Sequence, residues 1–192
     1  MKILVISDKE SEILTDFYSE NNFEDISFVL SAGDLSYSYL QTIKSNLNKP
    51  LYYVQGNHDI HKPKFFDKEN IEWKVGECGG IRILGIGCRK RNGQIMTDAE
   101  MTRRLNRVYQ RIKSKGHIDI VIAHYPALGI GDGQDKAHTG FLAIKEFVEK
   151  IKPAYFVYGH NHLNYGKGDR VIRMNDIIFL NAYEKFVIEF ER

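Results

Sequence analysis

The sequence predicts an α/β fold organised around a largely parallel β-sheet. Short apolar runs rich in Ile, Val, Tyr and Phe alternate with amphipathic segments, which is typical of that class. The chain has 192 residues, of which 43% are apolar and 27% are charged, so its composition is that of an ordinary globular protein. We therefore expect one domain over residues 1–192.

The first third of the chain reads as an alternation of strands and helices, βαβαβ. Apolar runs predict strands over Ile3 to Ile6, Ser27 to Ser31 and Leu51 to Gln55. Amphipathic spacing predicts helices between them, over Glu12 to Glu20 and Tyr37 to Asn46. This alternation favours parallel pairing of the three strands.

The middle of the chain predicts a hairpin followed by a long helix. Residues 73–76 and 81–87 read as short strands joined through Gly79 and Gly80. Thr97 and Glu100 match a capping box, so we expect the helix to begin there and to end at Gly116. Its apolar stripe at helical spacing consists of Met101, Leu105, Val108 and Ile112.

The last third predicts one more helix and several strands. A buried strand over Ile118 to Ala123 leads through a glycine-rich loop into a helix from about Phe141 to Ile151. The strand Tyr155 to Tyr158 follows. A closing antiparallel set is then expected over Val171 to Met174, Ile177 to Asn181 and Phe186 to Phe190.

The charge balance gives no reason to expect a nucleic-acid or membrane partner. Lys and Arg number 27 and Asp and Glu 25, so the formal charge is +2. The N-terminal apolar run is only four residues long, too short for a signal peptide or a membrane span. We expect a cytoplasmic protein in which Cys78 and Cys88 are free thiols.

Residues with metal-ligand chemistry directly follow five of the expected strands. A single Asp in such a place is most simply a turn residue or a helix cap, and a single His is most simply a solvated or satisfied side chain. Because ligands of open α/β sheets bind beyond the carboxyl ends of the strands, the whole set predicts a metal site at one rim. The set comprises Asp8, Gly33-Asp34, Gly56-Asn57-His58-Asp59, His124 and Gly159-His160-Asn161-His162.

The donor types indicate which metals fit. Two carboxylates, an amide oxygen and three imidazoles, without a thiolate, suit Mn, Fe, Zn or Ni. A shared carboxylate can bridge two ions about 3.5 to 4 Å apart, the spacing used in two-metal phosphoryl chemistry. We expect two divalent metal ions as cofactors, with Mn favoured and Mg a further candidate.

These motifs, in this order, resemble those of the calcineurin-like metallophosphoesterases, which are D-x-H, G-D, G-N-H-D, a lone H and G-H-x-H. The resemblance covers essentially the whole chain, and the stretch Gly131 to Gly140 is similar to the small prokaryotic members. It implies a four-layer αββα sandwich, in which two mixed β-sheets are flanked by helices.

The resemblance also implies a role for each motif residue. Asp34 would bridge the two metals and a hydroxide between them would attack phosphorus, with His58, oriented by Asp59, stabilising the transition state or protonating the leaving oxygen. The remaining ligands would be Asp8 and His162 for one ion, and Asn57, His124 and His160 for the other.

The first motif departs from the family pattern, because Glu10 stands where D-x-H has a histidine. Glu10 can coordinate directly, which would favour Mn, Mg or Fe over Zn. Alternatively it acts through a water, or the first metal site is weak. We expect direct or water-mediated ligation, because a carboxylate is itself a competent ligand for these ions.

Substrate-binding residues are harder to identify. Arg89 and Arg91 follow a strand exit and could bind a phosphate bidentately, although a plain charged loop fits equally well. His138 lies in a glycine-bounded loop that could line the cleft or be ordinary surface. The sequence leaves the substrate and the oligomeric state open.

The function expected from these observations is hydrolysis of a small phosphate ester, with a phosphodiester preferred. A phosphomonoesterase is the first alternative. A non-catalytic binding or scaffold protein of the same fold, with a weakened first metal site, is the second alternative and has only Glu10 in its favour. Nuclease activity is disfavoured by the near-neutral charge.

Overall fold

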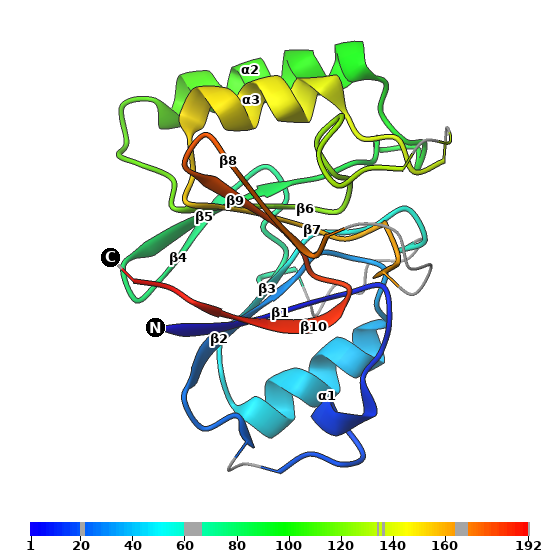
Figure 1. Ribbon diagram of the computed structural model, residues 1–192, viewed down its shortest axis with the longest axis vertical. Helices are drawn as coiled ribbons and strands as arrows, with labels where there is room; N and C mark the ends of the chain where they lie inside the picture. The colour runs from blue at the N-terminus through cyan, green and yellow to red at the C-terminus, as the bar shows by residue number, and fades with distance from the viewer. Residues whose placement is uncertain (20–21, 60–66, 134, 136, 164–168, 192) are drawn as a thin grey trace.

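The chain folds into two β-sheets that face each other, with helices on the two outer sides (Figure 1). The computed structural model describes residues 1–19, 22–59, 67–133, 135, 137–163 and 169–191. The strands form a four-stranded sheet in the order β10-β1-β2-β3 and a six-stranded sheet in the order β4-β5-β6-β7-β9-β8. This arrangement confirms the expected four-layer αββα sandwich.

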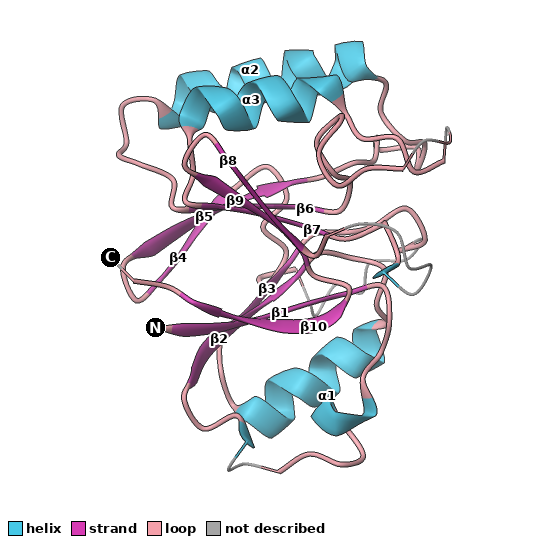
Figure 2. Cartoon of the chain, viewed as in Figure 1, coloured by secondary structure: helices cyan, strands magenta, loops and turns pink. Residues whose placement is uncertain are grey.

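The four-stranded sheet contains the N-terminal βαβαβ region. Strands β1 (Lys2–Ser7), β2 (Ile26–Ser31) and β3 (Leu51–Tyr53) pair in parallel. Strand β10 (Glu184–Glu189) adds to β1 in antiparallel register, and the chain ends exchange hydrogen bonds there. Helix α1 (Tyr37–Leu47) covers the outer face, as Figure 2 shows.

The six-stranded sheet is parallel at its centre and antiparallel at both edges. Strands β5, β6, β7 and β9 pair in parallel, whereas β4 and β8 each form a hairpin with the neighbouring strand. The strands are β4 (Val75–Cys78), β5 (Ile81–Ile86), β6 (Ile120–Ala123), β7 (Tyr155–Tyr158), β8 (Val171–Met174) and β9 (Ile177–Asn181).

Helices α2 (Asp98–Ile112) and α3 (Leu142–Ile151) lie side by side over the outer face of the six-stranded sheet (Figure 1). The predicted capping box is confirmed, since the Thr97 side chain accepts from the Glu100 N–H and the Glu100 carboxylate accepts from the Thr97 N–H. All four residues of the predicted apolar stripe, namely Met101, Leu105, Val108 and Ile112, are buried.

Successive side chains of the central strands pack into different hydrophobic cores on the two faces of each sheet, which explains their continuous apolar runs. In β1, Ile3 and Val5 face the core between the sheets, whereas Leu4 and Ile6 face α1. In β6, residues 120 and 122 face the core between the sheets, whereas 121 and 123 face α2 and α3. A strand buried on both faces cannot show polar alternation.

The helix predicted over Glu12 to Glu20 was wrong for the described residues up to Ser19. A short 3-10 helix, η1 (Glu12–Leu14), is followed by turns. Ser11 offers no side-chain cap, since its hydroxyl donates to Glu184 Oε1 at 3.1 Å and accepts from Lys185 Nζ at 3.0 Å. The Leu14 carbonyl accepts from Asn46 Nδ2 at 3.1 Å, so it is engaged by a tertiary contact instead of extending the helix.

All three strands of the predicted closing antiparallel set are present, but only two of them pair with each other. Strands β8 and β9 form the expected hairpin, and β9 also pairs in parallel with β7. Strand β10 leaves that sheet altogether and joins β1. The two sheets therefore share the C-terminal segment, a relation that residue periodicity does not encode.

We predict that Thr97→Ala lowers the free energy of unfolding by about 1 kcal/mol, because it leaves the Glu100 N–H in the first turn of α2 without its acceptor. Thermal or urea unfolding followed by circular dichroism would measure the loss. Thr97→Ser keeps the hydroxyl acceptor and serves as the control. Equal stability of the Ala and Ser variants would contradict a stabilising role of the cap.

Candidate metal centre

The carboxyl ends of β1, β2 and β6 bring three candidate ligand residues together. Asp8, Asp34 and His124 follow these strands, and one ligand atom from each lies within 4.8 Å of the others. The positions come from both sheets, so the cluster lies where the two sheets meet at one end of the sandwich. The strand-exit pattern had predicted this convergence for these three residues.

His124 is fully buried and its ring is fixed in one orientation. Its Nδ1 lies 2.8 Å from the Ala32 carbonyl oxygen, which can only accept, so Nδ1 carries the hydrogen. Nε2 then lies 2.8 Å from Asn57 Oδ1 and 3.3 Å from Asp34 Oδ2. A backbone carbonyl behind the imidazole is the usual support of a metal-ligating histidine.

The electrostatics around His124 favour positive charge. Burial lowers the pKa of His124, but the carboxylates of Asp34 and Asp8 outweigh this and raise its pKa overall. Burial likewise opposes ionisation of Asp34, yet the hydrogen bonds and charge of His124 and the His58 N–H hold the pKa of Asp34 below its ordinary value. The two carboxylates therefore place negative charge beside the imidazole, which favours a proton or a metal cation at this position.

The Asp59 carboxylate stabilises the loop after β3 through hydrogen bonds to the backbone. Its Oδ2 accepts from the N–H groups of Asp34 at 2.9 Å and Gly56 at 2.8 Å, and burial raises its pKa. The His58 N–H donates to Asp34 Oδ1 at 2.8 Å. The His58 ring is 83% exposed, with Nε2 4.0 Å from Asp34 Oδ2.

Asp8 links the first and last motifs. Its side chain is 2% exposed, and burial raises its pKa. Both of its carboxylate oxygens accept from the His160 N–H, at 3.1 and 3.0 Å, and Oδ1 lies 3.7 Å from Nε2 of His162. The structure therefore brings residues 8 and 162 together across the whole chain.

The His160 ring packs between aromatic neighbours. Its Nε2 lies 2.7 Å from the Ala137 carbonyl, so this nitrogen carries the hydrogen and the lone pair is on Nδ1. The Tyr125 ring lies 4.2 Å away between centroids, and the His124 ring 5.1 Å away. Burial, followed by the charge of His124, lowers the pKa of His160 to about 4, so the ring is neutral as a ligand must be.

Two glycines in these turns make room for the carboxylates. A Cβ on Gly56 would lie 2.1 Å from Asp34 Oδ1, and one on Gly159 would lie 2.5 Å from Asp8 Oδ2. Neither distance is compatible with a methyl group. The motif glycines are therefore required by the close approach of the acidic side chains.

The other predicted site residues lie at varying distances from the cluster. Glu10 is exposed, and its Oε1 accepts from the Ser36 hydroxyl at 2.6 Å, at the start of α1. Arg89 Nη1 donates to the carbonyls of Asn57 and Asp59, at 3.0 and 3.2 Å, so Arg89 contacts the backbone of residues 56–59, which we call the motif loop. Arg91 is exposed on the following loop.

His138 is partly exposed and lies near the cluster. Its Nδ1 pairs with Asp135 at 2.9 Å, and its ring centroid is 5.4 Å from that of His160. The same loop supplies the Ala137 carbonyl that holds His160. Sequence reasoning missed the supporting carbonyls of Ala32 and Ala137, because a backbone oxygen leaves no residue-type signal.

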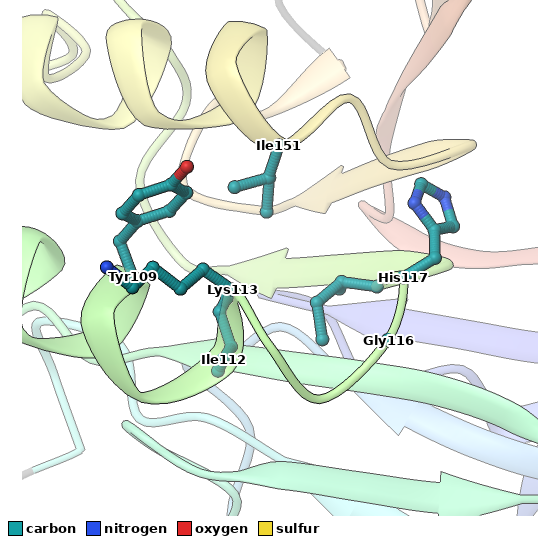
Figure 3. Close-up of a pocket in the computed structure, with 7 residues that line it drawn as sticks. Tyr109, Ile112, Lys113, Gly116, His117 and Ile151 are labelled. Atoms are coloured by element: carbon teal, nitrogen blue, oxygen red, sulfur yellow. The ribbon is translucent and has the colours of Figure 1, made fainter.

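A separate cavity of about 410 Å³ lies at the other end of the six-stranded sheet (Figure 3). Residues from the ends of α2 and α3 and from the loop before β6 line it, among them Tyr109, Lys113, His117 and Ile151. It lies at the amino ends of β6 and β7, whereas the ligand cluster lies at their carboxyl ends.

None of the described helices is long and apolar enough to cross a membrane.

The calcineurin-like phosphoesterase family model matches residues 1–164, and the chain therefore belongs to that family. No curated protein matches the sequence. The solved structure of GAP50, the anchor in the inner membrane complex of Plasmodium, is 14% identical, covers 94% of this chain and 70% of its own, and has a TM-score of 0.56. This similarity supports the fold.

Two further structures show weaker similarity. An archaeal phosphodiesterase is 16% identical over 96% of this chain and 84% of its own, with a TM-score of 0.48. Zinc-bound Vps29 of Entamoeba histolytica is 16% identical over 95% of this chain and 74% of its own, with a TM-score of 0.47.

We predict that Gly56→Ala lowers divalent-metal affinity by at least about tenfold, because the new methyl group would displace the Asp34 carboxylate. Calorimetric titration with Mn²⁺ would measure the change. Gly76→Ala is the control, since its Cβ would make only ordinary contacts at 3.4 Å or more. Unchanged metal affinity in Gly56→Ala would show that the position of Asp34 does not determine binding.

Proposed function

We propose that the protein is a dimetal-dependent hydrolase of phosphate esters, and that its preferred substrates are small phosphodiesters. The observation that supports this most directly is the convergence of three side chains, in which Asn57 Oδ1 and Asp34 Oδ2 lie 2.8 and 3.3 Å from His124 Nε2. Oxygen and imidazole donors without thiolate suit Mn²⁺, which we propose as the native metal.

The proposed ligands fall into two groups that share Asp34. Asn57, His124 and His160 would hold one ion, while Asp8 and His162 would hold the other. His162 Nε2 lies 3.7 Å from Asp8 Oδ1, which leaves room for a cation between them after a small side-chain shift. Bound divalent ions would lower the pKa of a water and neutralise charge on the phosphoryl oxygens.

His58 is the proposed catalytic acid. Its backbone is fixed by the bond to Asp34 Oδ1, while its ring is exposed, and we propose that the ring meets the ester oxygen of a bound substrate. A proton held on the imidazole would pass to the leaving oxygen as its bond to phosphorus breaks. Asp59 would position His58 indirectly, because it holds the turn through the N–H groups of Asp34 and Gly56.

The candidate centre is accessible on the side of His58 and His162. Their side chains are 83% and 40% exposed, so we propose that the ester approaches the buried Asp8, Asp34 and His124 from that side. Arg89 is engaged by two carbonyls of the motif loop, and we propose that it positions that loop. A phosphomonoester remains the alternative substrate, and comparing bis-p-nitrophenyl phosphate with p-nitrophenyl phosphate would decide between them.

We also propose that the protein acts in the cytoplasm. Cys78 and Cys88 are both free thiols, and Cys88 is buried. Free thiols persist in the reducing cytosol.

We predict that His58→Ala reduces kcat on bis-p-nitrophenyl phosphate by about 10²- to 10⁴-fold, since a general acid contributes on that order. Metal content should stay near the wild-type value, because the ring lies outside the Asp8, Asp34 and His124 cluster. Steady-state kinetics with Mn²⁺ and metal analysis would measure both. His117→Ala, which lies by the distal cavity, is the control.

Two results would contradict the proposal. Full turnover in His58→Ala would remove His58 from the mechanism. Absence of turnover in the metal-loaded wild-type protein on both test esters would favour a binding or scaffold protein of this fold.

We predict that Glu10→Ala lowers the occupancy of one of the two metal ions, because we propose that Glu10 ligates it directly or through a water. Glu10 bonds the Ser36 hydroxyl instead of an atom of the cluster, so ligation would require the carboxylate to rotate. Metal analysis after dialysis would measure the occupancy. Full retention of both ions would assign Glu10 to the start of α1, and Ser36→Ala is the matched control for that role.

A further inference from the structure

The C-terminal half of α2 and the residues after it carry an unusual concentration of positive charge. Residues 98–115 contain six basic and two acidic residues, although basic residues in the whole chain exceed acidic ones by only two. All six basic residues are exposed. The chain therefore has a locally positive surface although its net charge is only +2.

Four arginines gather at this surface. Arg104, Arg107 and Arg111 are spaced three and four residues apart, which places them along one face of α2. Arg91 lies on the loop that precedes the helix, and the ion pair of its neighbour Lys90 with Glu100, at 3.0 Å, holds that loop against the first turn. We call Arg91, Arg104, Arg107 and Arg111 the arginine face.

Trp73, the only tryptophan of the chain, fixes two of these side chains. The guanidinium carbon of Arg104 lies 4.4 Å from the centre of the Trp73 ring, and Arg111 Nη2 donates to the Trp73 carbonyl at 3.3 Å. Trp73 itself has a φ of 62°, a conformation that is costly for a bulky residue. Its N–H donates to the Gly85 carbonyl at 2.7 Å, which helps to hold it.

The arginine face has no close ion pair with an acidic residue in the part of the chain that the structure describes. Within the described ranges, no carboxylate lies within 4.0 Å of any of its four guanidinium groups. Glu72 is the acidic residue that acts on Arg104, and its Oε1 accepts from the Gln55 N–H. Burial and then repulsion from Arg111, Arg107 and Arg91 lower the pKa of Arg104, so these three charges lie close enough to act on it.

The arginine face approaches the proposed metal centre at its Arg91 end, whereas Arg111 lies in the last turn of α2. A Cβ on Gly87, the residue after β5, would lie 2.7 Å from Trp73 Nε1. Two residues further on, Arg89 donates to the carbonyls of Asn57 and Asp59 in the motif loop. One continuous stretch, residues 87–91, therefore runs from Trp73 past the motif loop to Arg91.

We propose that the arginine face is a binding site for a phosphate group of the substrate other than the one that is hydrolysed. Guanidinium groups bind phosphate oxygens through paired, charge-assisted hydrogen bonds, and the stacking of Arg104 on Trp73 reduces the entropy lost on binding. The substrate would thus be a phosphate ester that carries at least one further phosphate. The catalytic part of this inference rests on the proposed function, whereas the anion-binding part does not.

Binding to the metal-free protein tests the anion site alone. The probe is tripolyphosphate, titrated by calorimetry in the presence of EDTA, against the wild type and the double variant Arg107→Ala/Arg111→Ala. We expect the double variant to bind at least about tenfold more weakly, since two charge-assisted contacts are lost. The control is Arg173→Ala in β8, which removes an exposed arginine at the opposite edge of the sheet.

Equal affinity of the wild type and the double variant would overturn the site. A loss in Arg173→Ala as large as in the double variant would also overturn it, because binding would then reflect overall charge only. Titration with an oligothymidylate identifies the source of the phosphate. Tighter binding of the oligothymidylate than of tripolyphosphate indicates a nucleic-acid strand, and weaker binding indicates a small polyphosphorylated ester.

Kinetics separate this inference from the proposed function. In the metal-loaded protein, the double variant should raise KM for p-nitrophenyl esters of tripolyphosphate while leaving KM for bis-p-nitrophenyl phosphate unchanged. Equal KM changes on both esters would contradict a subsite for a second phosphate. Failure of both esters to react in the wild type would reject the proposed function but would leave the binding result standing.

Discussion

The hydrogen bond between His124 Nδ1 and the Ala32 carbonyl determines the geometry of the candidate metal centre. Strand β6 of one sheet carries the imidazole, and the carbonyl lies just beyond β2 of the other sheet. The bond therefore joins the two halves of the sandwich and directs Nε2 at Asp34 and Asn57. Without it the ring could rotate, and the three donors would no longer face one point.

Much of the fold and of the site followed from local sequence patterns. The capping box at Thr97, the apolar stripe of α2 and the strand exits at Asp8, Asp34 and His124 each have a residue-type signature, and the structure has each of them in place. The move of β10 to β1 had no such signature, because partner choice depends on the assembled sheet. The 3-10 turn after Ser11 depends on Glu184 and Asn46, which are distant in sequence.

Backbone conformation at the candidate centre was also beyond prediction. Asp8, Asp34 and His160 have φ values of 62°, 54° and 68°, in the left-handed region that non-glycine residues avoid. Each such residue costs about 1 to 3 kcal/mol unless its surroundings hold it. Hydrogen bonds between carboxylates and N–H groups stabilise this conformation in the motif turns. The Asp59 carboxylate accepts from the Asp34 N–H, and the Asp8 carboxylate accepts from the His160 N–H.

The antiparallel pairing of β1 with β10 has a kinetic consequence. Lys2 lies opposite Glu189 and Ser7 opposite Glu184, so one edge of the four-stranded sheet closes a loop of nearly the whole chain. Contacts between such distant residues carry a large loop-closure entropy and slow folding. Until β10 arrives, β1 presents an unpaired apolar edge that invites pairing with other chains. The order in which this strand docks thus governs how long the folding chain is vulnerable to aggregation.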